Sequence, residues 1–110
     1  MNEAGELQPE GAEDPAEQAL GRASAYLAAD RPQLARRELE RALAQDPDDV
    51  RLHLKLATVE LHEGRWEEAA ERFEEVLEHE PGLARAHIGL ALAQKELGQL
   101  PQSERSALEA

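Results

Sequence analysis

Cysteine is absent from the 110-residue chain, and only three aromatic residues occur in it. Without cysteine there can be no disulfide framework, no thiolate nucleophile and no cysteine-ligated metal site. No apolar run is long enough to span a membrane, and the N-terminus lacks the basic and then apolar pattern of a secretory signal. We therefore expect a cytoplasmic protein.

Basic residues are also scarce, with 12 Lys and Arg against 24 Asp and Glu, which gives a formal net charge of −12. Nucleic-acid binding needs a basic face, so this balance argues against such a partner. No nucleophile, base and orienting group stand at a spacing typical of catalysis, and there is no glycine-rich phosphate loop. The sequence therefore predicts neither an enzyme nor a bound cofactor.

The residues that are abundant, namely Ala, Leu, Glu, Arg and Gln, favour helix. Residues 1–15 differ from the rest because they hold five acids, two glycines and two prolines, with Leu7 as their one large aliphatic side chain. Such a segment has little to bury, and we expect a disordered acidic leader. Order should begin at Asp14-Pro15-Ala16-Glu17, where Asp can cap a helix and Pro suits its first position.

Beyond the leader the sequence repeats with a period of 34 residues. Pairs of unrelated residue types share this separation: Asp46-Pro47 with Glu80-Pro81, Gly64 with Gly98, His53 with His87, Leu56 with Leu90, and Ala57 with Ala91. A constant period of this length indicates a stack of helical units. We place the units at residues 16–49, 50–83 and 84–110, the last one incomplete.

Each unit is predicted to form two helices joined by a short turn. The turns are expected at Asp30-Arg31-Pro32, Gly64-Arg65 and Gly98-Gln99, since Gly suits the residue after a helix and Pro the first turn of the next. Residues 50–56 alternate apolar and polar as a strand would, but Leu56-Ala57 breaks the alternation. As a helix, this segment carries two apolar stripes: Val50, Leu54, Ala57 and Leu61, and Leu52, Leu56 and Val59. Two stripes predict a helix covered on two sides.

These residues resemble the tetratricopeptide repeat, whose 34-residue unit follows W-x2-L-G-x2-Y, then A-x3-F, then P. The middle unit matches with His53, Leu56, Ala57, Glu60, Ala69, Phe73 and Pro81; the first with Ala23, Tyr26, Ala35, Leu39 and Pro47; the third with His87, Leu90, Ala91, Gln94, Ser103 and Ala107. The resemblance implies an all-α fold, a right-handed superhelical stack of about three antiparallel helical hairpins. It also implies a protein-binding module that works as an adaptor or co-chaperone-like scaffold.

Departures from the family pattern fall on its aromatic positions. Histidine replaces the tryptophan in units two and three, and Glu60 and Gln94 replace the tyrosine. Some chaperone-binding members hold a C-terminal carboxylate in a clamp of Lys, Asn, Asn, Lys and Arg. The corresponding residues here are Leu20, Ser24, Lys55, Arg85 and Gly89, of which only Arg85 keeps the chemistry, so we do not expect that clamp.

In relatives of this type, the first helix of each hairpin lines a concave groove that holds a peptide. The predicted groove row is Arg51, Lys55, Thr58 and His62 in unit two, with Arg85 and Leu92 on the matching row of unit three. Basic residues at the centre of an acidic protein predict a partner with a carboxylate or other acidic group and an apolar anchor. The same row could be an ordinary solvated helix face.

Other features have simpler interpretations. His53 and His87 could be metal ligands, but equivalent positions of stacked helices lie about 10 Å apart, too far for one ion, and we expect packing residues and no metal site. The acids of residues 67–80 suggest a solvated outer face. An alternative function is self-association into a homo-oligomer, because no helix follows the third hairpin to cover its inner face.

Overall fold

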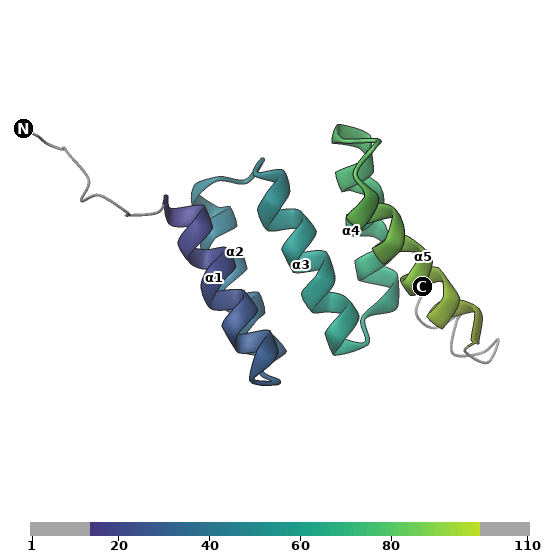
Figure 1. Ribbon diagram of the computed structural model, residues 1–110, viewed down its shortest axis with the longest axis horizontal. Helices are drawn as coiled ribbons and strands as arrows, with labels where there is room; N and C mark the ends of the chain where they lie inside the picture. Colours follow the sequence, from purple (N-terminus) through teal and green to yellow (C-terminus); the bar gives the residue numbers. More distant parts are fainter. Residues whose placement is uncertain (1–13, 100–110) are drawn as a thin grey trace, which may run out of the picture.

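The computed structural model of the chain describes residues 14–99. It contains five α-helices in that range, namely α1 (Pro15–Ala28), α2 (Pro32–Gln45), α3 (Val50–Glu63), α4 (Trp66–His79) and α5 (Ala84–Gln99). Figure 1 shows them following one another across the molecule, each antiparallel to the next. The predicted all-α solenoid is confirmed, with two complete hairpins and the first helix of the third among the described residues.

Local signals set the ends of these helices. Asp14 caps α1 by accepting a hydrogen bond of 2.8 Å from the backbone N–H of Glu17, and Pro15 and Pro32 open α1 and α2. Gly64 ends α3 with a left-handed φ of 78°, a conformation that costs glycine nothing. The residues that begin α1 and close α3 were therefore predicted correctly.

The third predicted turn is wrong. Gly98 and Gln99 belong to α5, and Gly98 does not adopt a positive φ as Gly64 does. A glycine permits a left-handed end to a helix but does not enforce one, so the same residue type gives two outcomes at equivalent repeat positions. The predicted helix from Leu100 to the end of the chain, and Pro101 at its start, lie outside the described residues, as do residues 1–13 of the predicted leader.

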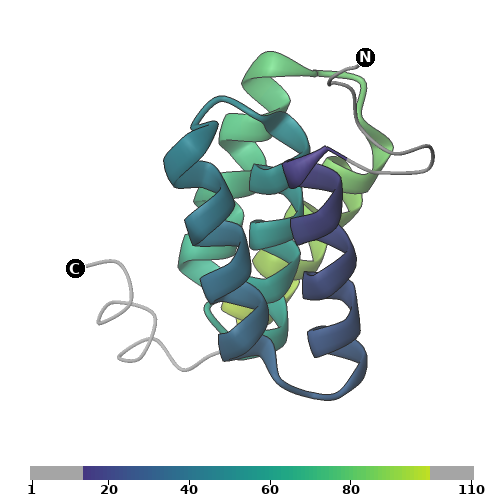
Figure 2. The same cartoon turned by 90° about the vertical axis from the view of Figure 1, so that its left-hand side faces the viewer.

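The helices form two layers. Consecutive helices pack against each other, and α3 also contacts both α1 and α5, so α1, α3 and α5 share one layer while α2 and α4 cover the other side. Seen from the α1 end, α1 and α2 stand side by side nearest the viewer with the later helices behind them (Figure 2). Within residues 14–99 no helix is long and apolar enough to cross a membrane.

Helix α3 divides the core into two clusters. Its stripe of Leu52, Leu56 and Val59 packs with residues of α1 and α2, including the fully buried Ala23 and Leu39. The opposite stripe, with Ala57 at its centre, packs with Ala69, Phe73 and Val76 of α4 and with Ala86 and Ala93 of α5. The predicted helix with two covered sides is thereby confirmed, and each fully buried Leu or Phe side chain contributes about 1.5–3 kcal/mol.

Small residues sit where the helices cross. Ala23, Ala35, Ala57 and Ala69, which match the small-residue positions of the repeat, are fully buried. Ala91 is exposed, although it occupies the repeat position of Ala57, and Ala86 and Ala93 are the buried alanines of α5. In unit two the residue at the Ala91 position packs on the second helix of its hairpin, and the corresponding segment of unit three lies outside the described residues.

Candidate functional site: a groove across α1, α3 and α5

A large hollow crosses the layer formed by α1, α3 and α5. It has a volume of about 630 Å³ and is lined by Leu20 and Ser24 of α1, Arg51, Leu54, Lys55, Thr58 and Leu61 of α3, Phe73 of α4, and Arg85, Ile88, Gly89 and Leu92 of α5. We call it the inner groove. Its volume is in the range of ligand-binding clefts in proteins.

Five of the six residues predicted from the sequence line the inner groove: Arg51, Lys55, Thr58, Arg85 and Leu92. His62 does not, because the lining on α3 ends at Leu61. Leu54, Leu61, Phe73 and Ile88 also line the groove but were not among the residues predicted from the sequence. The i, i+4 spacing of Ile88 and Leu92 on one helix face was the signal that could have found this apolar pair.

The apolar part of the groove is concentrated on α5. Ile88 and Leu92 are 61% and 49% exposed, which makes them the large hydrophobic side chains that the described residues leave most open to solvent. Both line the same hollow as the half-buried Leu54 and Leu61 of α3. Apolar side chains gathered in a hollow are typical of a surface that a partner covers.

The floor of the groove depends on a close approach between α4 and α5. Phe73 of α4 is 1% exposed, and its ring lies against the backbone of Gly89. A Cβ atom at position 89 would overlap the ring, so only glycine fits this arrangement without a shift. The missing side chain lets Phe73 reach the groove floor from the outer layer.

Arg51 contributes less positive charge to the groove than the sequence suggested. Its Nη2 atom lies 2.7 Å from Oδ2 of Asp49, and its Nη1 atom lies 3.8 Å from carboxylate oxygens of both Asp14 and Glu17. The hydrogen bond from Arg51 holds the pKa of the Asp49 carboxyl below its usual value. Asp49 also caps α3 through the Arg51 backbone N–H at 2.9 Å. Arg51 is therefore part of the arrangement that caps α3. Its place in the predicted groove row did not indicate this role.

Lys55 and Arg85 carry the positive charge at the centre of the groove. Burial lowers the pKa of the half-buried Lys55 amino group, and the nearby positive charge of Arg85 lowers it further. Within residues 14–99 neither side chain forms an ion pair with an acid. Thr58 is less free, since its hydroxyl donates a 3.1 Å hydrogen bond to the Leu54 carbonyl.

The two repeat histidines serve the structure of the turns before their helices. His53 Nε2–H donates to the Pro47 carbonyl at 2.7 Å, and His87 Nε2–H donates to the Pro81 carbonyl at the same distance. A carbonyl can only accept, so the proton is on Nε2 in both rings. His53 is half-buried, as expected of a packing residue, whereas His87 is exposed, contrary to that expectation.

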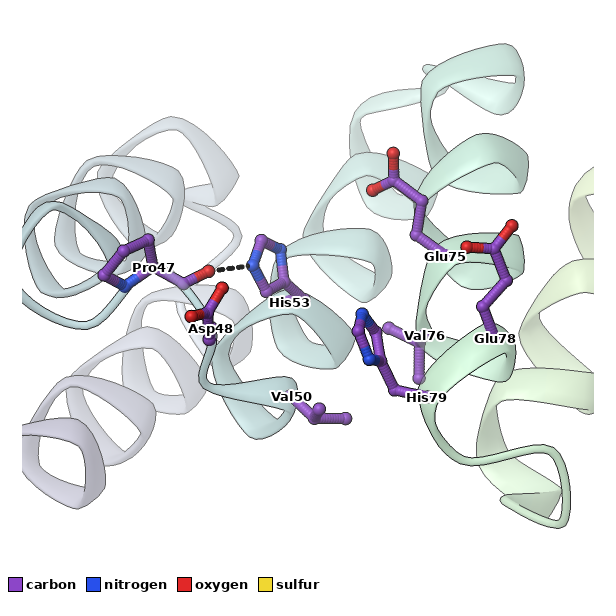
Figure 3. Close-up of a pocket in the computed structure, with 8 residues that line it drawn as sticks. All are labelled: Pro47, Asp48, Val50, His53, Glu75, Val76, Glu78 and His79. Carbon is purple, nitrogen blue, oxygen red and sulfur yellow. Dashed lines mark hydrogen bonds between the residues drawn. The ribbon is translucent and has the colours of Figure 1, made fainter.

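A second, smaller hollow lies beside His53. Figure 3 shows His53 turned toward Pro47, with Glu75, Glu78 and His79 of α4 on the other side of a space of about 240 Å³. No three His, Asp or Glu side chains within residues 14–99 are arranged so as to hold a metal ion. The rings and carboxylates around this hollow therefore do not form a metal centre among themselves.

The family of the chain follows from comparison with models of known protein families. Two family models, both described as tetratricopeptide repeat, match the chain at residues 20–78 and 60–106. The chain belongs to the tetratricopeptide repeat family. No curated protein and no solved structure matched it.

The five positions of the family's carboxylate clamp all line the inner groove of this tetratricopeptide repeat protein. They are Leu20, Ser24, Lys55, Arg85 and Gly89. The side chains at these positions differ from those of the clamp, apart from Arg85. Tetratricopeptide repeats generally mediate protein–protein interactions, on a fold that is typically not enzymatic.

Proposed function

We propose that the inner groove binds a segment of another protein in which an acidic group stands next to an apolar side chain, and that the chain works as an adaptor or scaffold. One observation carries this proposal. Two cations without an acidic partner among residues 14–99, Lys55 and Arg85, share a hollow with the exposed Ile88 and Leu92.

The charged form of Lys55 is disfavoured by burial and by the positive charge of Arg85, and an anion bound between the two side chains would offset both effects. Covering Ile88 and Leu92 adds a hydrophobic contribution of about 25 cal/mol for each Å² of apolar surface removed from water. Charge supplies orientation and apolar contact supplies much of the affinity.

The test compares partner capture by wild type with capture by the double variant Lys55→Glu/Arg85→Glu. We leave Arg51 unchanged because it holds the cap of α3, and reversing it would disturb the fold together with the groove. The matched control is Glu71→Lys/Glu75→Lys on the exposed face of α4. Captured proteins are compared by mass spectrometry after circular dichroism has shown that both variants keep their helices.

We expect the groove variant to lose the captured partners and the α4 variant to keep them. The opposite result would place the interface on the acidic outer face and contradict the proposal. Self-association through the third hairpin is the other function considered, and its inner face at residues 103–110 lies outside the described residues. Light scattering coupled to size-exclusion chromatography tests self-association, because a monomeric mass at high protein concentration would contradict it.

A further inference from the structure

Lys55 and Arg85 differ from most of the nearby arginines in that no acid among residues 14–99 pairs with them. Arg22 pairs with Glu38, Arg36 with Glu63 and Arg72 with Glu60, at distances of 2.9, 3.1 and 3.0 Å. Acids outnumber bases two to one in the chain, yet residues 14–99 supply none to the two cations of the inner groove. A ligand for this site therefore needs an acidic group and an apolar side chain close together.

The chain contains such a sequence outside residues 14–99. Residues 1–13 hold Glu3, Glu6, Glu10 and Glu13, no Lys or Arg, and the single large aliphatic residue Leu7 directly after Glu6. This is the chemistry just described, an acid beside an apolar anchor. Its charge is opposite in sign to that of the groove centre, whereas the chain as a whole carries an excess of acids.

The point where this segment joins the fold lies at one end of the groove. Asp14, which precedes α1, has its Oδ2 atom 3.8 Å from Nη1 of Arg51, and Arg51 lines the groove. Lys55 lies one turn along α3 from Arg51, a rise of about 6 Å, and α5 is the adjacent helix at about 8–10 Å. Seven extended residues span up to about 25 Å. The chain from Asp14 back to Leu7 is therefore long enough to reach the centre of the groove.

Because residues 1–13 are covalently joined to the fold, weak contacts are sufficient for them to occupy the groove. A segment joined to the groove through a short stretch of its own chain acts at an effective concentration of about millimolar. One acid–base contact and one buried leucine can then occupy the groove for a substantial part of the time, while a partner of higher affinity can still displace them.

We propose that residues 1–13 bind in the inner groove of their own chain, with a glutamate at Lys55 and Arg85 and with Leu7 on Ile88 and Leu92. The segment then competes with the partner for the groove. This inference rests on the proposed function, because it takes the groove to be the binding site.

The absence of cysteine allows a direct test on the full chain. Gln8→Cys introduces one thiol beside Leu7 and leaves Leu7 and all four glutamates in place. A nitroxide attached to this thiol broadens the amide signals of nearby residues in ¹⁵N-labelled protein. We expect Lys55, Gly89 and Leu92 to lose most of their intensity relative to the reduced label.

The same label in the Lys55→Glu/Arg85→Glu background should restore those signals, while Glu71→Gln/Glu75→Gln on α4 should leave the broadening unchanged. Broadening confined to the first residues of α1, or broadening that survives the groove variant, would overturn the inference. A mixture of spin-labelled ¹⁴N chains with unlabelled ¹⁵N chains must show no broadening of the groove, since an effect there would mean that the segment binds a second copy.

These measurements need no partner, so the inference can be contradicted while the proposed function stands, and the reverse. If the groove signals are unaffected by the label but capture still depends on Lys55 and Arg85, the inference is wrong and the proposed function stands. If the label broadens the groove while capture is indifferent to Lys55 and Arg85, the segment occupies the groove and the partner binds elsewhere.

Discussion

Gly89 shows how one absent side chain shapes the groove. Alanine is favoured over glycine in a helix by up to about 1 kcal/mol, but overpacking a core typically costs about 1–3 kcal/mol. Because the Phe73 ring occupies the place of a Cβ atom at position 89, we expect the second effect to win. Gly89→Ala should therefore lower the free energy of unfolding, measured by urea denaturation, by about 1–2 kcal/mol.

Gly21 is the matched control for this prediction. It lies within α1, and a Cβ atom built there meets nothing within 4 Å. Gly21→Ala should therefore stabilise the protein by about 0.5–1 kcal/mol. If both substitutions stabilise to the same extent, the Phe73 ring does not rest on Gly89.

The charge coupling between Lys55 and Arg85 gives a second prediction at the residue scale. Arg85→Gln removes a neighbouring positive charge and should raise the pKa of Lys55 toward its ordinary value. The return should be partial, because burial is the larger cause of the lowering and remains. The chain has two lysines, so a pH titration of ¹³C-labelled lysine side chains, assigned with Lys55→Arg, measures the shift. An unchanged or lower pKa would mean that the two cations do not share the groove centre.

At the scale of the helix pair α3 and α4, two departures from the family pattern form one network. Glu60, at the tyrosine position, is 4% exposed and bonds to Arg72 of α4 at 3.0 Å. The Arg72 guanidinium also donates to Nδ1 of His53, at the tryptophan position, at 3.4 Å. A polar side chain on α4 thus compensates for two polar residues at positions that the family fills with aromatic rings.

Arg72→Leu should destabilise the protein because it leaves the Glu60 carboxylate buried without a partner. Breaking a buried pair in this way costs about 3–5 kcal/mol, and we expect about 2–3 kcal/mol here because Arg72 keeps some contact with solvent. In the Glu60→Gln background the same substitution should cost clearly less. Equal costs in the two backgrounds, read from urea midpoints, would mean that Glu60 does not depend on Arg72.

The elements themselves were largely predictable from local pattern. The two stripes of α3 follow from the spacing of its apolar residues, and each stripe packs into one of the two core clusters. That α5 continues through Gly98 was not predictable, since glycine permits a turn without requiring one. The pairing of Arg51 was also hidden, because it depends on Asp49 at the cap and on α1, which stacking brings beside α3.

At the scale of the whole molecule, the acids of α4 and the two cations of the groove lie in different layers. Exposed glutamates crowd α4 in the outer layer, while Lys55 and Arg85 lie in the groove of the inner layer. The period of 34 residues predicts the stack and therefore which helix faces share a groove. It does not predict that Ile88 and Leu92 stay exposed, because burial depends on how neighbouring helices cross.

The central claim is that the inner groove selects an acidic group next to an apolar side chain. Selection from a display library of random peptides against the immobilised full chain tests it most directly. The account predicts that the enriched peptides combine Asp or Glu with an adjacent large apolar residue and lose binding to the Lys55→Glu/Arg85→Glu variant. Enrichment of basic peptides that bind wild type and this variant equally, but fail on Glu71→Lys/Glu75→Lys, would contradict it.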